Sequence, residues 1–230
     1  MKIAFTSDID WAPEQVIEDF LDLFLEYNVK CTFFCTHESL TLKKANKDLI
    51  ELAIHPNFND TLLGKTNNSP KNIIDNLMNI YPEAVGVRSH SLTSNSYLQL
   101  LFNEFGLLYD SNLYYPFVDK AQAYKCWTGL TRIPFHWEDD LHFYEKKSYD
   151  FDFTNLIENN RLILNFHPIH VFLNTDCLET YQQGKKFYQE PNELIKFRNK
   201  DKIGTRDLLI KLLKQSSDMN FDNVKLKEIL

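Results

Sequence analysis

The pattern of apolar positions changes its period twice within the first forty residues. Residues 2–8 and 31–36 are short runs rich in apolar residues, and the second is apolar on both faces. Between them, residues 13–27 carry apolar side chains at helical spacing, namely Val16, Phe20, Leu23, Phe24 and Tyr27. A period of 3.6 predicts an amphipathic helix, and a run that is apolar on both faces is typical of a buried parallel strand. This part of the chain therefore predicts a strand–helix–strand unit.

The same alternation continues through the rest of the chain. We expect further strands at 53–55, 85–87, 107–109, 131–134 and 162–166. We expect helices at 43–52, 70–81, 95–105, 151–159, 178–188 and 206–214. About seven strands, most of them separated by helices, indicate a parallel α/β fold, either a barrel or a doubly wound sheet.

Polar side chains with catalytic or metal-binding chemistry follow the predicted strands. They are Asp8 and Asp10, His55 and Asn59, Arg88 and His90, Asp110, Arg132 with the segment 137–140, and His167. In a closed parallel barrel the carboxyl ends of the strands meet on one rim, which is the usual place for an active site. The recurrence of such groups after six predicted strands therefore indicates one shared site.

Composition and charge narrow the classes of function. A chain of 230 residues that is 43% hydrophobic can bury one sizeable core, so we expect a single domain over residues 1–230. The net charge of −7 argues against a nucleic-acid surface. We recognise no N-terminal leader pattern and no apolar run of membrane-spanning length, and we therefore expect a cytoplasmic protein without a transmembrane segment. The four cysteines fit this expectation as free thiols.

The pair Asp8 and Asp10 suggests a metal. On a strand, residues two apart point to the same face, and two carboxylates there repel each other unless a cation or a proton intervenes. Carboxylate and imidazole together suit zinc, and three protein ligands with an open position make a hydrolytic centre. A second carboxylate can then take a proton from water, and a histidine can give one to a leaving amine. Asp8, Asp10, His55 and His167 supply these groups.

These motifs resemble, in order, those of the polysaccharide deacetylase family, the NodB-homology domain of carbohydrate esterase family four. The segment Thr6–Asp10 is similar to the first family motif, which implies that Asp8 is the general base and Asp10 a metal ligand. The second motif has two metal-binding histidines four residues apart. His55 matches the first of them, whereas Asn59 stands in place of the second. Either Asn59 is therefore a weak third ligand, or His90 from the next loop completes the site, or the site holds metal poorly.

The remaining motifs extend the resemblance to residue 167. Arg88 matches the arginine that orients the catalytic base, and His167, after the apolar run 162–166, matches the general-acid histidine. Trp137 and Asp140 lie in a segment that is similar to the fourth motif. We expect both residues to contact substrate, together with Trp11 and Arg132. The resemblance implies a distorted (β/α)7-type barrel of parallel strands with outer helices.

The expected function is a metal-dependent hydrolase, with zinc as the expected metal, that removes an N-acetyl group from an acetamido-sugar. The set of motifs is more similar to the surface-polysaccharide and O-antigen branch than to the secreted enzymes. A nucleotide- or lipid-linked precursor is therefore the expected substrate, with peripheral contact to membrane-linked biosynthetic enzymes. A deformylase is a close variant. The alternative is a catalytically degenerate member that binds sugar or stabilises a biosynthetic complex, because the second histidine is missing.

Overall fold

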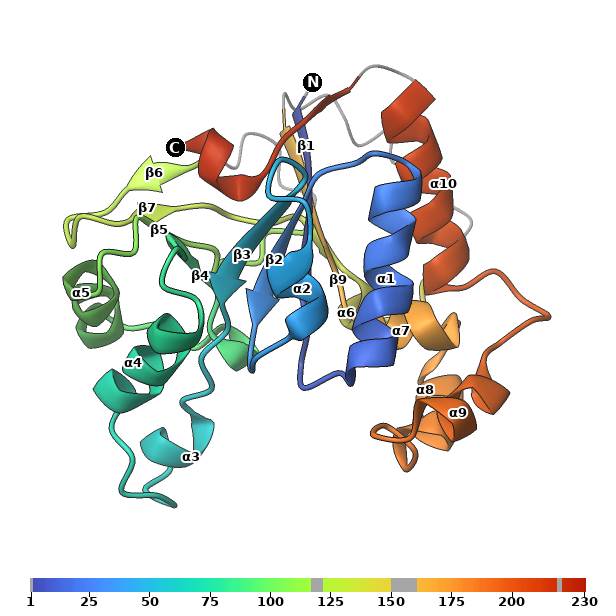
Figure 1. The fold of residues 1–230 in the computed structure, drawn as a ribbon, viewed down its shortest axis with the longest axis horizontal. Coiled ribbons are helices and arrows are strands. Elements are labelled where there is room, and N and C mark those ends of the chain that lie inside the picture. Colours follow the sequence, from blue (N-terminus) through green and yellow to red (C-terminus); the bar gives the residue numbers. More distant parts are fainter. Residues whose placement is uncertain (1, 117–121, 150–160, 219–220) are drawn as a thin grey trace.

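The computed structural model describes residues 2–116, 122–149, 161–218 and 221–230 (Figure 1). Within these residues one sheet contains the strands β1 (Lys2–Asp8), β2 (Cys31–Cys35), β3 (Ile50–Ile54), β4 (Gly86–Val87), β5 (Tyr109–Asp110), β6 (Tyr124–Lys125), β7 (Thr131–Arg132), β8 (Trp137–Glu138), β9 (Arg161–Phe166) and β10 (Asp222–Asn223). The helices are α1 (Glu14–Glu26), α2 (Leu40–Lys44), α3 (Asn59–Leu62), α4 (Pro70–Ile80), α5 (Ser96–Glu104), α6 (Asp139–Tyr144), α7 (Pro168–Leu173), α8 (Leu178–Lys185), α9 (Pro191–Leu194) and α10 (Thr205–Asp218). No helix in these ranges is both long and apolar enough to cross a membrane.

The sheet is mostly parallel and strongly curled. Its strand order is β6-β7-β5-β4-β3-β2-β1-β9-β8, with β10 paired to β1, and among the described pairs of strands only β6 and β7 run antiparallel. Residues 133–136 connect β7, near one end of this order, to β8 at the other end. The Ile133 amide donates to the Asp110 carbonyl of β5, and the His136 amide donates to the Ile163 carbonyl of β9. This short connection joins the two sides of the sheet, and the predicted distorted barrel is confirmed.

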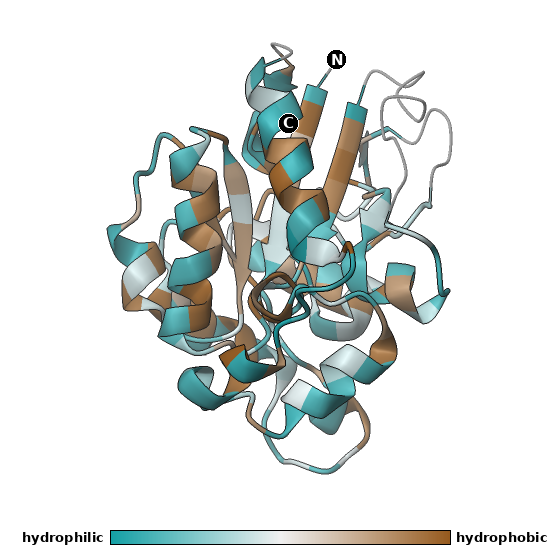
Figure 2. Cartoon of the chain, turned by 90° about the vertical axis from the view of Figure 1, so that its right-hand side faces the viewer, coloured by the Kyte–Doolittle hydropathy of each residue, from teal (hydrophilic) through white to brown (hydrophobic). Residues whose placement is uncertain are grey.

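Alternate residues of the central strands pack in two different apolar environments. Phe5 of β1 and Phe33 of β2 pack against α1, with ring centroids 5.8 Å from Phe24 and 5.7 Å from Phe20. The next residue of β2, Phe34, belongs instead to a cluster inside the curled sheet. Figure 2 shows the strands as largely hydrophobic and the covering helices as mixed. Burial on both faces explains why the run 31–36 carries apolar residues on both faces.

Most of the predicted elements are present, and the structure adds short ones that were not predicted, such as α3, α7 and α9. The expected helix at 43–52 is wrong, because α2 ends at Lys44 and β3 begins at Ile50. β3 pairs along its full length with β2, and this pairing outweighs a weak local helical pattern. The segment 139–144, for which no helix was predicted, forms α6. The expected helix at 151–159 lies outside the described residues.

The C-terminal segment closes the barrel at the end opposite the carboxyl ends of the strands. Val224 and Leu226 belong to the interior apolar cluster. The Leu226 amide donates to the Thr32 hydroxyl at 3.0 Å, and the Lys227 amide donates to the Glu51 carboxylate at 3.1 Å. The barrel is therefore sealed at one end, which leaves the carboxyl ends of the strands for a site.

Glu51 is a buried carboxyl at this sealed end, and its pKa predicts a pH-dependent stability. It also accepts hydrogen bonds from the hydroxyls of Thr32 (2.9 Å) and Tyr109 (3.0 Å). Burial raises the pKa of Glu51 above its usual value of about 4.3. A raised folded-state pKa contributes stability that is complete below the unfolded pKa and is lost as the pH rises through the folded pKa. Glu51→Gln should therefore become more stable relative to wild type as the pH rises above about 4.3.

Urea unfolding of both proteins between pH 4 and pH 8 checks this expectation. The quantity to compare is the difference in the free energy of unfolding at each pH. A difference that does not change with pH would mean that the folded state does not disfavour the ionised form of Glu51.

Candidate metal and hydrolytic site

The loop after β1 has an unusual backbone that places Asp10 over the strand ends. The Ala12 amide donates to the Ile9 carbonyl at 2.7 Å, which closes a turn around Asp10 and Trp11. Both central residues have positive φ, 37° for Asp10 and 58° for Trp11. Such a backbone costs about 1–3 kcal/mol at each non-glycine residue, so the surrounding structure must hold it.

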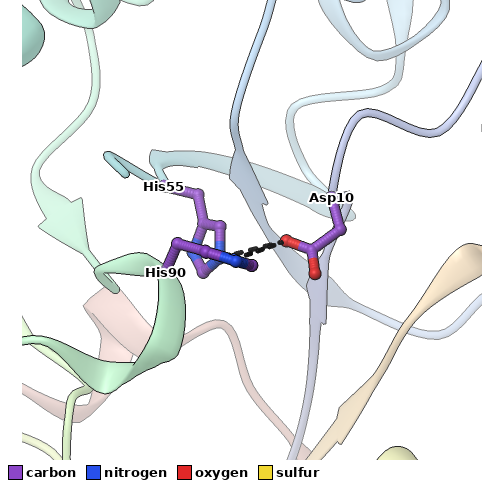
Figure 3. Close-up of side chains that lie close together, drawn as sticks. All are labelled: Asp10, His55 and His90. Carbon is purple, nitrogen blue, oxygen red and sulfur yellow. Dashed lines mark ion pairs between the residues drawn. The ribbon is translucent and has the colours of Figure 1, made fainter. Parts of the chain in front are cut away.

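Asp10, His55 and His90 converge at this position (Figure 3). The Asp10 Oδ1 atom lies 3.3 Å from His55 Nε2 and 3.3 Å from His90 Nδ1. Asp10 and His55 follow β1 and β3, and the His90 amide donates to the Pro56 carbonyl, which links the loop after β4 to the loop after β3. Buried Asp10 Oδ1 and His55 Nδ1 have no hydrogen-bond partner among the described residues.

These three side chains fit a divalent metal. Ligand atoms around a tetrahedral zinc with bonds of about 2.0–2.1 Å lie about 3.3 Å apart, which matches both distances from Asp10. Burial would raise the pKa of Asp10, but the neighbouring His55 and His90 imidazoles lower it well below its usual range. The nearby Asp10 carboxylate raises the pKa of His90. A carboxylate and two imidazoles with this spacing suit zinc.

Asn59 lies in a different setting. It is the first residue of α3, and its side-chain amide donates to the Ser91 hydroxyl at 3.1 Å. A cavity of about 130 Å³ at the site is lined by Asp8, Asp10, His55, Ser89, His90, Ser91, Leu92, Glu138, Asp140 and His167. Asn59 is not among these residues. Of the two candidates for the third ligand, the structure places His90 with Asp10 and His55.

Asp8 and Arg88 form a buried ion pair beside this triad. Arg88 Nη1 lies 3.0 Å from Asp8 Oδ1, and the Asn165 amide donates to Asp8 Oδ2 at 3.0 Å. The fully buried guanidinium lies between the rings of Phe34 and Phe135, 4.3 Å and 4.4 Å from their centroids. Sequence reasoning missed Asn165, although a single polar residue inside the apolar run 162–166 was a visible signal.

His167 is paired with Asp139. Its Nδ1 lies 2.7 Å from Asp139 Oδ1, and its backbone amide donates to Asp139 Oδ2 at 2.8 Å. Burial would lower the pKa of His167, but the Asp139 carboxylate raises it well above the usual range. His167 Nε2 lies 3.8 Å from Asp10 Oδ2, so the histidine faces the candidate metal centre. Asp139 was expected only as part of a loop motif, whereas here it holds the ring of His167.

Two further acids, Glu138 and Asp140, line the same small cavity. Burial and the charge of Asp140 raise the pKa of Glu138 well above its usual range, which favours its protonated form. The cavity therefore offers hydrogen-bonding groups of both kinds, a carboxyl donor and carboxylate acceptors.

A larger cleft of about 520 Å³ opens next to this cavity. Asp10, His90, Asp140 and His167 line both spaces. Its other lining residues are Trp11, Phe143, Tyr144, Ile169, His170, Leu178, Tyr181, Lys185, Tyr188 and Gln189. The aromatic members give the cleft flat apolar surfaces, which suit the faces of sugar rings. The sequence-predicted residues Trp11 and Asp140 are thus placed at the cleft.

Two predicted substrate contacts lie elsewhere. Trp137 is only 1% exposed and its indole N–H donates to His142 Nδ1 at 3.1 Å, so it is a core residue and not a cleft residue. Arg132 pairs with Asp110 at 2.9 Å and donates to the Ser94 hydroxyl at 3.1 Å. Neither Trp137 nor Arg132 lines the cleft or the small cavity. The prediction that they contact substrate is not supported by their positions.

Comparisons with known proteins agree with this fold. Residues 5–185 match the family model described as WbmS-like, polysaccharide deacetylase. A structure from Bordetella bronchiseptica, assigned as a polysaccharide deacetylase involved in O-antigen biosynthesis (WbmS), is 35% identical, with a TM-score of 0.87, and the match covers 93% of this chain and 90% of that one. No curated protein sequence matches the chain.

Two more distant structures share the fold. One, assigned as a polysaccharide deacetylase from Mycobacterium smegmatis, is 19% identical with a TM-score of 0.58, and the match covers 99% of this chain and 88% of that one. The other is a peptidoglycan N-acetylglucosamine deacetylase, 14% identical with a TM-score of 0.52, and the match covers 100% of this chain and 87% of that one.

Proposed function

Because the chain belongs to the WbmS-like polysaccharide deacetylase family, we propose that it is a metal-dependent hydrolase that removes the acetyl group from an acetamido-sugar. One observation carries this proposal. A carboxylate and a histidine adjoin the Asp10–His55–His90 triad, because Asp8 Oδ1 lies 3.9 Å from His55 Nδ1 and His167 Nε2 lies 3.8 Å from Asp10 Oδ2. Amide hydrolysis needs both a proton acceptor for water and a proton donor for the amine.

Asp8 has the position of the general base. Asp10, His55 and His90 would hold a divalent metal such as Zn²⁺, which would supply Lewis-acid chemistry toward water and the amide carbonyl. Each carboxylate oxygen of Asp8 receives one hydrogen bond, from Arg88 or from Asn165, and keeps a further lone pair for the proton of the attacking water. Arg88 and Asn165 thereby fix the orientation of the base.

His167 has the position of the general acid. Asp139 holds its Nδ1, so the proton on Nε2 faces the centre and can pass to the nitrogen of the departing amine. The same carboxylate favours the protonated ring, which is the form that an acid needs before the C–N bond breaks.

The cleft suits a sugar that is attached to a carrier. Its volume of about 520 Å³ exceeds that of the small cavity at the triad, and Lys185 on its wall can pair with an anionic group. The related Bordetella protein is described as involved in O-antigen biosynthesis. We therefore propose a nucleotide- or lipid-linked acetamido-sugar precursor in surface-polysaccharide synthesis as the substrate. We predict that the enzyme meets this substrate in the cytoplasm. We also predict peripheral contact with membrane-linked biosynthetic enzymes.

Acetate release tests the proposed function. The purified protein is supplied with zinc and incubated with a nucleotide-linked acetamido-sugar, and free acetate is measured with and without a chelator. We expect release that depends on zinc and that is absent in Asp8→Asn. Sugar binding without release, in a protein that holds zinc, would instead support the alternative of a degenerate, sugar-binding member of the family.

A further inference from the structure

The turn that carries Asp10 is held from outside by a distant part of the chain. The Tyr188 hydroxyl donates to the Asp10 carbonyl at 2.6 Å, and the Gln189 side-chain amide donates to the Trp11 carbonyl at 2.9 Å. On the other side, the Trp11 amide donates to the Thr36 hydroxyl at 3.0 Å. Two consecutive side chains thus hold the two consecutive carbonyls of the turn.

This turn needs such support because of its backbone. Asp10 and Trp11 both have positive φ, a conformation that normally selects glycine or asparagine and is an outlier for a bulky residue. Trp11 also packs edge-on against His90, with ring centroids 5.1 Å apart. The turn therefore helps to position two of the three candidate metal ligands, because it carries Asp10 and its Trp11 packs against His90.

The segment that carries Tyr188 is itself fixed. The Tyr188 amide donates to the Lys185 carbonyl at the end of α8. In α8, Gly184 lies so close to α7 and α9 that an added Cβ would be 3.1 Å from Leu173 and 3.2 Å from Leu194. α7 begins directly after His167. The helix before Tyr188 is therefore packed against the helix that follows the candidate general acid.

We propose that Tyr188, assisted by Gln189, is a positioning residue that holds the strained Asp10–Trp11 turn and so presents the Asp10 carboxylate to the metal. This inference rests on the proposed metal centre. Tyr188 is not a ligand, because it acts on the backbone carbonyl of a ligand. Groups that orient a ligand in this way raise metal affinity, and losing one costs about 10- to 100-fold in affinity. Tyr188 and Gln189 also line the cleft, which connects the wall of the substrate site to the metal ligand.

A matched pair of tyrosine substitutions tests the inference. Tyr188→Phe removes only the hydroxyl that reaches Asp10. Tyr181→Phe removes a hydroxyl from the preceding helix, α8, that forms no hydrogen bond with the turn in the described part of the chain. Zinc affinity is measured for the purified full chain by competition with a chromophoric chelator. We expect Tyr188→Phe to bind zinc about 10- to 100-fold more weakly than wild type. We expect Tyr181→Phe to bind zinc like wild type, and Gln189→Ala to show a smaller loss.

A general structural role would give a different result. Urea unfolding in the presence of a chelator reports the stability of the metal-free fold, and a merely structural tyrosine would lower that stability without a separate loss of zinc affinity. Equal zinc affinity in wild type and Tyr188→Phe would overturn the inference while leaving the proposed function intact. If Tyr188→Phe does not fold, unchanged affinity in Gln189→Ala overturns it instead. A wild-type protein that binds no zinc would overturn the metal centre and this inference together.

Discussion

Replacing His167 by asparagine is expected to lower the rate of sugar deacetylation by about 10²- to 10⁴-fold, the usual contribution of a general acid. An asparagine amide can still donate to Asp139, so the buried carboxylate keeps a partner in place of the His167 Nδ1. The variant cannot, however, transfer a proton to the leaving amine. We therefore expect zinc content and folding stability near those of wild type, with turnover alone reduced.

An activated ester gives this prediction a second readout. An aryl acetate has a leaving group that needs no protonation, so His167→Asn should lose much less activity on the ester than on the acetamido-sugar. Asp8→Asn removes the proton acceptor for water and should lose activity on both substrates. Acetate release and aryl alcohol release measure the two reactions. Equal losses on both substrates in His167→Asn would show that the histidine is not the general acid.

Replacing His90 by alanine is expected to remove stoichiometric zinc from the protein. His90 Nδ1 lies 3.3 Å from the Asp10 carboxylate, at the spacing of two ligands of one metal. Loss of a residue that only orients a ligand costs about 10- to 100-fold in affinity, and the loss of a ligand itself should exceed this range. The zinc content of the purified protein and its affinity by chelator competition measure the effect.

Asn59→Ala is the matched control for His90→Ala. Asn59 follows β3 as His90 follows β4, but its side-chain amide donates to Ser91 and it does not line the cavity. We expect Asn59→Ala to retain zinc. The reverse result, in which Asn59→Ala loses zinc and His90→Ala retains it, would assign the third ligand to the position that the family motif gives it.

Several features of the fold follow from local sequence alone. The helical period over residues 13–27 and the doubly apolar run at 31–36 are sufficient to predict α1 and β2, because the period of apolar positions reflects which faces of an element are buried. The same reasoning predicts that Asp8, His55, Arg88 and His167 share one rim, since the carboxyl ends of parallel strands lie at one end of a barrel. These residues do line or border one site in the structure.

Other features depend on contacts between residues far apart in sequence. Asn165 of β9 and Arg88, which follows β4, both meet Asp8, and Tyr188 reaches Asp10 across 178 positions. No local pattern contains such a contact, because it depends on how the strands are ordered and how the sheet curls. The position of Trp137 also depends on the tertiary structure. A tryptophan in a motif-like segment was expected at the substrate, but the path of β8 buries it in the core.

The sequence by itself therefore determined the class of fold, the order of its central elements and the residue types of the candidate metal site. The periods of burial and the parallel strand ends are local properties that a sequence displays directly. The tertiary structure alone decided that His90 and not Asn59 lies with Asp10 and His55, because α3 begins at Asn59 whereas the His90 backbone bonds to Pro56. It also decided that Asp139 holds His167 and that a distant tyrosine holds the Asp10 turn. These are choices among chemically plausible side chains, and only their distances in space distinguish them.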